Sequence, residues 1–211
     1  MNILLIGPPA VGKGTQAAKI SDLMGLKHLS TGDVLREASN KGTEEAKRIV
    51  EILALGKYVP DDLVCSLVKQ AMMESNRGVV FDGFPRTVDQ AHFLEREKIE
   101  IDYVIELCLS DQLVEERISG RSVHMPSGRV YHNQFNPPKE QGIDDVTGEP
   151  LAIRDDDKVD VVRSRLKIYH QMTKPLLDLY SQESRSGKFH QVDASLPIDT
   201  VFSNICDHLS S

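Results

Sequence analysis

The sequence predicts an α/β fold built on a five-stranded parallel sheet flanked by helices. Three observations lead to this prediction. Short apolar runs alternate with stretches of helical spacing along most of the chain, as they do when right-handed crossovers join parallel strands. The first run, residues 2–6, leads into a glycine-rich loop and then a helix. A later run, residues 78–82, is apolar on both faces, which is typical of a strand buried in a parallel sheet.

The individual elements follow from local signals along the chain. The apolar runs predict strands at residues 2–6, 27–30, 78–82, 102–109 and 189–192. Stripes of helical period predict helices at residues 13–24, around 36, at 43–55, 61–72 and 87–98, around 116, and at 159–179 and 197–209. Thr31 or Asp33 is expected to cap the helix around residue 36, and Pro175 is expected to kink the long helix.

The alternation of strands and helices breaks between residues 120 and 157. Short apolar stretches in this region are separated by prolines and glycines, which indicates a small β-rich insertion. With 211 residues, the chain is long enough for one main domain that carries insertions.

The composition is that of a globular protein without a broad basic surface. The formal net charge is −7, so no nucleic-acid partner is expected. The cysteines, Cys65, Cys108 and Cys206, are odd in number and far apart, which favours reduced, apolar core residues in a cytoplasmic protein. No secretory signal and no apolar run of the ~18 residues of a membrane span is visible, so no membrane association is expected.

The loop after the first strand has the spacing of a phosphate-binding loop. Gly7 is followed by four residues, Gly12 and Lys13, which is the Walker A pattern and indicates a fold of the P-loop NTPase type. Backbone N–H groups in such a loop bind phosphate, and Lys13 adds a mobile positive charge. Gly14 replaces the Ser or Thr that usually holds Mg²⁺, and Thr15 follows it. We therefore expect Mg²⁺ to be held mainly by phosphate oxygens and water.

Three loops are expected to converge on one crevice. The loops after residues 6, 30 and 82 all follow carboxyl ends of parallel strands, where ligands bind in such sheets. Arg36 and Arg86 follow two of these ends, and a guanidinium group fits a phosphate bidentately. Five further arginines flank the insertion: Arg121, Arg129, Arg154, Arg163 and Arg165. A single arginine is most often a solvated side chain, but several of them near strand ends in an acidic protein favour an anion site.

Residues and motifs that are missing from the sequence narrow the set of reactions that the chain could catalyse. No nucleophile is apparent, and transfer between two phosphates needs none because the acceptor is already an anion. Asp82 stands where a Walker B aspartate would, but Gly83 follows it in place of a catalytic glutamate. An Asn-Lys-x-Asp guanine-reading motif is also missing. Both absences argue against an ATPase motor and a GTPase switch.

Four motifs stand out: GPPAVGKGT at residues 7–15, STGD at 30–33, DGFPRT at 82–87 and GRVYH at 128–132. Together they closely resemble the adenylate kinase family in its long-lid form, and the resemblance covers essentially the whole chain. It implies a kinase that reversibly transfers a phosphoryl group from Mg-ATP to AMP, giving two ADP, in nucleotide biosynthesis. It also implies a core of residues 1–29, 60–119 and 158–211, a helical AMP-binding domain at 30–59 and a lid at 120–157.

The resemblance further implies which residues form the site. AMP would be held by Thr31, Gly32, Arg36, Lys57, Tyr58, Val59, Gly83, Phe84, Pro85, Arg86, Gln90, Arg154 and Arg165. ATP would be held by Ala10, Val11, Gly12, Lys13, Gly14, Thr15, Arg117, Arg121, Val130, Tyr131 and the backbone near Leu196. The catalytic residues would be Lys13, Arg86, Arg121, Arg154 and Arg165. The amide of Gln90 can donate and accept on one base edge, which suits adenine.

Two positions depart from the family pattern. Ala10 stands in place of a glycine that is common in this loop. If the backbone there needs a positive φ, the alanine costs about 1–2 kcal/mol. Ser122 replaces the second arginine of a common Gly-Arg-Arg, which leaves Arg121 as the candidate phosphate ligand.

The insertion also poses a question about metal binding. His124-x-x-Ser127 and Asp144-x-x-Thr147 occupy the places where some relatives carry two cysteine pairs that bind zinc. Serine and threonine hydroxyls are poor zinc ligands. We therefore expect a hydrogen-bonded cluster that joins the two halves of the insertion, and no zinc.

Two other functions remain open. The same fold could phosphorylate UMP or CMP, or the chain could be a regulatory module that binds nucleotides without turnover. Thr31 and Gln90 favour AMP through the resemblance, and the full set of arginines weighs against a mere binder. The expected partners are ATP, AMP and ADP, and the protein is expected to be a monomer.

Overall fold

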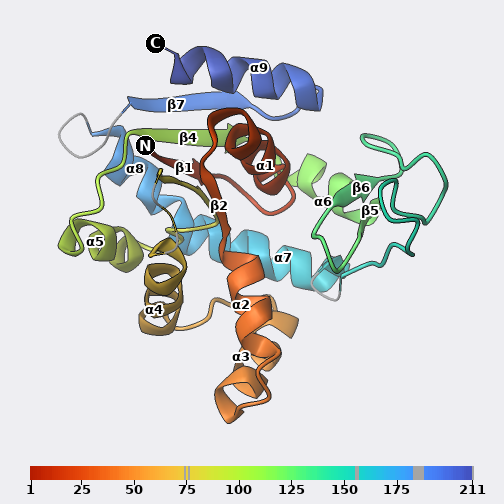
Figure 1. Cartoon of the computed structure of the whole chain (residues 1–211), viewed down its shortest axis with the longest axis horizontal. Helices are drawn as coiled ribbons and strands as arrows, with labels where there is room; N and C mark the ends of the chain where they lie inside the picture. Colours follow the sequence, from red (N-terminus) through yellow and green to blue (C-terminus); the bar gives the residue numbers. More distant parts are fainter. Residues whose placement is uncertain (74, 76, 155–156, 183–187, 211) are drawn as a thin grey trace.

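The centre of the fold is a sheet of five parallel strands in the order β2-β3-β1-β4-β7, with helices on both faces (Figure 1). The strands are β1 Asn2–Ile6, β2 Lys27–Ser30, β3 Val79–Asp82, β4 Tyr103–Cys108 and β7 Lys188–Asp193. The computed structural model describes residues 1–73, 75, 77–154, 157–182 and 188–210, so parts of the predicted insertion (155–156) and core (183–187 and 211) lie outside the described residues. The predicted α/β fold is confirmed.

The register of the strands brings three carboxyl ends together. Leu5 and Ser30 each pair with Asp82, the last residue of β3. The loops that follow β1, β2 and β3 therefore leave the sheet at the same edge. Their predicted convergence follows directly from this parallel pairing.

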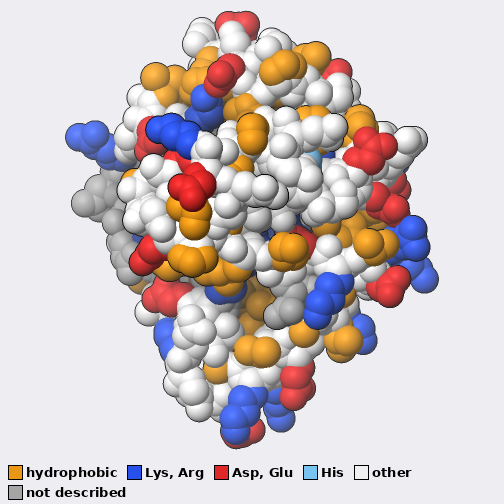
Figure 2. Space-filling view, turned by 90° about the vertical axis from the view of Figure 1, so that its right-hand side faces the viewer, with side chains coloured by type: hydrophobic (Ala, Val, Ile, Leu, Met, Phe, Trp, Pro, Cys, Tyr) orange, Lys and Arg blue, Asp and Glu red, His pale blue; other side chains and the backbone are white. Residues whose placement is uncertain are grey.

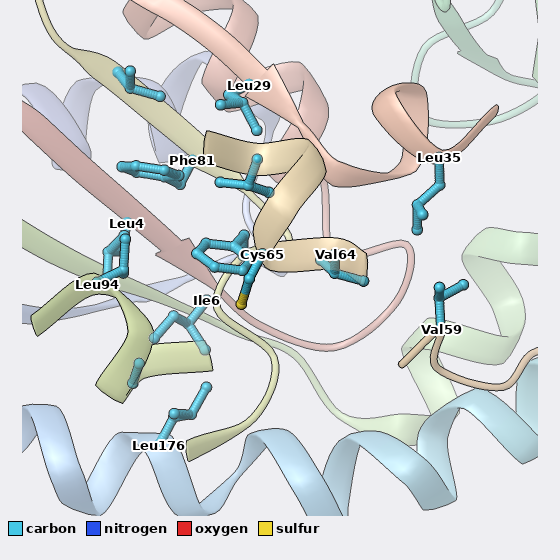
Figure 3. Close-up of a cluster of buried hydrophobic side chains, with 14 of the residues drawn as sticks. Leu4, Ile6, Leu29, Leu35, Val59, Val64, Cys65, Phe81, Leu94 and Leu176 are labelled. Carbon is cyan, nitrogen blue, oxygen red and sulfur yellow. The ribbon is translucent and has the colours of Figure 1, made fainter. Parts of the chain in front are cut away.

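The two faces of the sheet are covered by different helices. Side chains alternate along β1: Ile3 and Leu5 pack with α1 (Lys13–Met24) and α9 (Ile198–Leu209), whereas Leu4 and Ile6 face the other way. The second face is covered by α4 (Asp61–Met72), α5 (Val88–Arg96) and α8 (Pro175–Ser181). Figure 3 shows this second cluster, which Leu35 and Val59 join from the 30–59 segment. The 30–59 segment is therefore packed against the core at both of its ends.

Two helices of the 30–59 segment, α2 (Thr31–Ser39) and α3 (Glu44–Ala54), project away from the sheet (Figure 1). The predicted cap at Thr31 or Asp33 is wrong, because Ser30 caps α2 by accepting a hydrogen bond from the backbone N–H of Asp33. Thr31 is already the first helical residue, and its hydroxyl donates to the carbonyl oxygen of Asp82 at 3.3 Å.

The 120–157 segment follows α6 (Asp111–Ser119) and lies at the far side of the molecule from α5 (Figure 1). It contains a two-stranded antiparallel sheet of β5 (Arg121–Val123) and β6 (Val130–His132). Isolated bridges join Val123 to Ala152 and Ile143 to Pro150. The segment is therefore the small β-rich insertion that the prolines and glycines predict.

The long helix is interrupted by a π turn directly before Pro175. Its first part is α7 (Val159–Ile168), which continues as the π-helix η2 (Tyr169–Thr173). The N–H of Lys174 donates to the carbonyl oxygen of Tyr169 at 2.9 Å, which closes the wider turn. Pro175 begins α8, where its missing N–H is not needed. The interruption thus lies directly before Pro175, and the kink itself stays a prediction.

The three cysteines are unpaired, but only Cys65 is buried as predicted, while Cys108 and Cys206 are partly exposed. Acidic and basic side chains are intermixed on the face drawn in Figure 2, where the 120–157 segment faces the viewer. Across the described part of the chain, we find no helix with the length and apolarity that crossing a bilayer requires.

Candidate functional site

The converging loops line a cleft of about 580 Å³ at the carboxyl edge of the sheet. The cleft is bounded by the phosphate loop, the start of α2, residues 56–58, the loop after β3, the hairpin β5–β6 and the π-helix. Both inserted segments therefore contribute walls to the same space. Among the described residues, the cleft collects most of the predicted site side chains.

The phosphate loop has the tight geometry that its glycines predict. A Cβ on Gly7 would lie 2.7 Å from the carbonyl oxygen of Leu107, so no larger residue fits there. Gly12 has φ +102° and caps the N-terminus of α1. Ala10 has φ 54°, so the condition for its predicted strain is met.

Lys13 lies over this loop, and its pKa is strongly perturbed. Its Nζ donates to the carbonyl oxygens of Gly7 and Pro8, each at 2.8 Å. Burial lowers the pKa of Lys13 to about 7, against the attraction of Asp82. Three cleft guanidinium groups lower this pKa further: those of Arg86, Arg165 and Arg121. A polyanion bound in the loop would oppose all of these effects and favour the charged ammonium.

Arg86 is held in place by the loop that carries it and by a neighbouring ring. Its Nε donates to the carbonyl oxygen of Gly83 at 2.7 Å, and its guanidinium lies 5.3 Å from the ring centroid of Tyr58. A Cβ on Gly83, which has φ +79°, would lie 2.7 Å from Arg86 Nη2. Gly83 is therefore required for the guanidinium to lie against the loop.

Arg36 lies across the first turn of α2. Its Nη2 donates to Asp33 Oδ1 at 2.5 Å, and its Nη2 would lie 3.0 Å from a Cβ on Gly32. Burial opposes ionisation of Asp33, but the hydrogen bond and charge of Arg36 outweigh it, so the pKa of Asp33 is lowered. The sequence analysis did not single out Asp33 as an ion-pair partner.

Two other arginines share one buried carboxylate. Arg121 donates to both oxygens of Asp157, from Nε at 2.8 Å and also from Nη2, while Arg165 Nη1 lies 4.0 Å from Asp157 Oδ1. The Asp157 side chain is fully buried. Arg154 lines the same cleft, so the predicted charge set of the site is gathered at one place.

Some predicted residues do not line the cleft: Val11, Thr31, Val59, Phe84, Gln90, Arg117 and Leu196. Arg117 lies below the phosphate loop, where it donates to the carbonyl oxygens of Val11 (3.3 Å) and Ala194 (2.6 Å). Leu196 is partly exposed beyond β7. Gln90 is buried, with its Oε1 accepting from the N–H of Arg86 at 2.7 Å.

Sequence reasoning missed Phe135, whose ring centroid lies 5.3 Å from the guanidinium carbon of Arg117. Its ring is also tilted by 40° against the ring of His132, with 4.5 Å between the two ring centroids. The only sequence signal was an aromatic residue in a proline-rich insertion. Phe135 therefore connects the 120–157 segment to the part of the core beside the phosphate loop.

The 120–157 segment contains a dense hydrogen-bonded cluster around two buried groups. His124 contacts Ser127 from Nδ1 at 2.7 Å and Glu149 from Nε2 at 2.6 Å. Asp144 receives two hydrogen bonds from Arg129, at 2.8 and 2.6 Å, and two from Thr147, at 2.8 Å from its backbone N–H and at 2.9 Å from its hydroxyl. The hydrogen bond of Arg129 lowers the pKa of Asp144 well below its usual range. These contacts join the two halves of the segment.

No group of three or more His, Cys, Asp or Glu that could hold a metal ion occurs in the described part of the chain. The cleft does offer oxygen atoms of the kind that Mg²⁺ prefers, from Asp82 and Thr15. Asp82 Oδ2 lies 3.2 Å from the position of a Cβ on Gly14, so the carboxylate is close to the phosphate loop. The residues present therefore fit a magnesium ion that is bound to a nucleotide.

A comparison with protein families agrees with this geometry. A family model described as "Adenylate kinase" matches residues 5–185 of the chain. The matched range includes the phosphate loop, both inserted segments and the π-helix.

Proposed function

The chain belongs to the adenylate kinase family, a family of nucleoside monophosphate kinases that use Mg²⁺ with ATP, and we propose that its acceptor is AMP. The reaction would be the reversible conversion of Mg-ATP and AMP into two molecules of ADP. An oxygen of the AMP phosphate forms a bond to the γ-phosphorus of ATP. The bond from that phosphorus to the β,γ-bridging oxygen breaks, which leaves ADP in both sites.

One observation carries this proposal: two separate anion-binding groups face a single cleft. The phosphate loop with Lys13 forms one of them, and Arg36 with Arg86 forms the other. A protein that only binds ATP has no need of the second group. Transfer between two bound phosphates needs both, because its rate depends on positioning and charge stabilisation.

Each side chain has a role that its contacts support. Lys13 would follow the transferring phosphoryl group as a point charge, and Arg86 would hold the acceptor phosphate. Arg121 and Arg165, which share Asp157, would stabilise charge on the equatorial oxygens from the other side. Mg²⁺ would arrive with ATP, with Asp82 and Thr15 close enough to bind its water ligands.

We also propose that the 30–59 and 120–157 segments are the AMP-binding domain and the lid, and that they close over the remaining core when nucleotides bind. Phosphoryl transfer must exclude water, whereas nucleotide exchange needs an open cleft. Gly120, at the end of α6, marks the start of the 120–157 segment and is the position where we place a hinge. Release of product after opening would then limit the turnover number.

The proposed protein is a cytoplasmic monomer without zinc. Three unpaired cysteines support a reducing compartment. The hydrogen-bonded cluster of the lid supplies by itself the cross-connection that a metal would otherwise provide.

The reverse reaction provides a clean test. Purified protein is incubated with ADP and Mg²⁺ alone, and the nucleotides are separated by anion-exchange chromatography. We expect ATP and AMP to form in equal amounts, and Lys13→Ala to lose this activity while keeping its fold by circular dichroism. Formation of AMP and inorganic phosphate without ATP would indicate a hydrolase, and no conversion would exclude AMP as the acceptor.

A further inference from the structure

The π-helix η2 presents two of its side chains to the nucleotide cleft. Tyr169 and Thr173, its first and last residues, both line the cleft, and both are buried. The wider turn adds one residue to the helical repeat, and each residue of an α-helix turns by about 100°. A regular α-helix would therefore rotate Thr173 away from its present direction. Such turns inside α-helices occur frequently at functional sites.

The hydroxyl of Thr173 connects two segments that are distant in sequence. The Thr173 hydroxyl donates to the carbonyl oxygen of Arg86 at 2.9 Å. The hydroxyl of Tyr58 lies 2.8 Å from Thr173 Oγ1. Because a carbonyl oxygen only accepts, the single proton of Thr173 is used on Arg86. The Tyr58 hydroxyl must therefore donate to Thr173. The hydrogen bonds run in one direction, from Tyr58 through Thr173 to the backbone of Arg86.

Tyr58 contacts Arg86 a second time, through its ring. The guanidinium carbon of Arg86 lies 5.3 Å from the ring centroid of Tyr58. The backbone of Arg86 is thus held by Thr173 on its carbonyl and by Gln90 on its N–H, while its guanidinium lies against Tyr58 and the Gly83 carbonyl. Because Arg86 is held at both its backbone and its guanidinium group, few other orientations are available to its side chain.

We propose that Tyr58 and Thr173 are positioning residues, which the π-helix brings together to orient Arg86 toward the acceptor phosphate. This inference rests on the proposed function, in which Arg86 binds that phosphate. Tyr58 lies at the end of the 30–59 segment, and Thr173 belongs to the core helix. The bridge from Tyr58 through Thr173 therefore ties the acceptor side of the cleft to the core, and its two hydrogen bonds lead to Arg86.

The test uses variants that remove only a hydroxyl group. Tyr58→Phe keeps the ring, Thr173→Val keeps the branched shape, and Thr173→Ser keeps the hydroxyl as a rescue. Met172→Leu is the matched control, because Met172 is an exposed residue of the same turn. Initial rates are measured against AMP at saturating ATP, and against ATP at saturating AMP.

We expect Thr173→Val and Tyr58→Phe each to lower kcat/KM for AMP about five- to tenfold, as loss of one buried hydrogen bond does. KM for ATP should change less than about twofold, and the double variant should be no worse than the poorer single variant, since both remove one bridge. Thr173→Ser should restore most of the activity. Equal effects on both substrates, additive losses, or an unchanged kcat/KM for AMP in folded Thr173→Val would overturn the proposal.

Assays of the wild-type protein separate failure of the proposed function from failure of this inference. If it phosphorylates UMP or CMP in place of AMP, the same variants are measured with that acceptor and the same outcomes apply. If it phosphorylates no monophosphate, calorimetry is used to measure how tightly the wild-type protein and the variants bind AMP and ATP. Thr173→Val must then weaken AMP binding and leave ATP binding unchanged, and any other result overturns the inference.

Discussion

Gln90 Nε2 lies 2.6 Å from Asp61 Oδ1, and this contact determines which way the Gln90 amide faces. The other end of the amide, Oε1, accepts from the N–H of Arg86, which can only donate. The second oxygen of Asp61 accepts from the Thr87 hydroxyl at 2.6 Å. Thr87 must donate there, because a carboxylate oxygen only accepts, and its own oxygen accepts from the N–H of Gln90 at the start of α5. These contacts use the amide oxygen and one N–H of Gln90, so in the proposed function the second N–H would be the one that meets a base.

The first prediction concerns this carboxylate. In Asp61→Asn, one oxygen can accept from Gln90 or from Thr87 but not from both, so one buried donor loses its partner. We expect the free energy of unfolding to fall by about 1–3 kcal/mol and the preference for AMP over UMP and CMP to weaken. Chemical denaturation and acceptor kcat/KM ratios measure the two effects. Asp62→Asn, one residue further along α4, is the control and should change neither.

The second prediction concerns protonation of Lys13, whose pKa is lowered from its usual 10.5 to about 7. Bound triphosphate favours the charged form, so ATP binding at pH 8 should take up a proton. Calorimetry in buffers of different ionisation enthalpy measures this uptake. Lys13→Arg keeps a charge that does not titrate, and it should abolish the uptake. Equal uptake by both proteins would show that another group titrates.

The same shift has a consequence for stability. The unfolded chain binds more protons at Lys13 than the folded protein between pH 7 and 10.5, because the folded pKa is the lower one. The Lys13 contribution to the free energy of unfolding should therefore rise with pH across this window. The free energy of unfolding is measured for the wild-type protein and for Lys13→Arg at several pH values, and the difference between the two gives the Lys13 contribution.

The third prediction concerns the lid. Because Asp144, His124, Arg129 and Thr147 already satisfy one another by hydrogen bonds, we expect no stoichiometric zinc in protein purified without chelator. Elemental analysis measures the metal directly. A chelator should leave the thermal unfolding midpoint unchanged, whereas a large decrease would mean that a metal stabilises this segment.

The fourth prediction concerns closure of the cleft. Dyes attached through Val146→Cys in the lid and Leu23→Cys in α1, after removal of the native cysteines, report the distance between lid and core; both positions are exposed. A bisubstrate analogue joining two adenosines should bring the dyes closer. A pair within the core, Leu23→Cys with Met73→Cys, should not respond. No change in energy transfer on saturation would rule out closure.

The sheet could be predicted from sequence because its signals are local. A run such as residues 2–6, the spacing of Gly7, Gly12 and Lys13, and helical stripes each report on neighbouring residues, and parallel pairing then forces the loops to one edge. At Ala10 only the condition for strain could be stated from the sequence, and the structure shows that the condition is met, with φ 54°.

The remaining features depend on contacts between distant residues. The π turn was not predicted because one additional residue barely disturbs a broad apolar stripe, so residues 159–179 still read as one helix. Asp157, Asp61 and Phe135 carry no motif, and their importance comes from Arg121, Gln90 and Arg117 being placed beside them by the fold. Similarly, Ser30 replaces the predicted cap because only the strand end orients its hydroxyl.

The identity of the acceptor tests the central claim most directly. Purified protein is supplied with Mg-ATP and with AMP, UMP or CMP in turn, and kcat/KM is measured for each acceptor by a coupled assay of ADP formation. The account predicts that AMP is preferred by at least about a hundredfold, because a site built to hydrogen-bond one base leaves buried polar groups unpaired with another. Comparable kcat/KM values for UMP or CMP would contradict it.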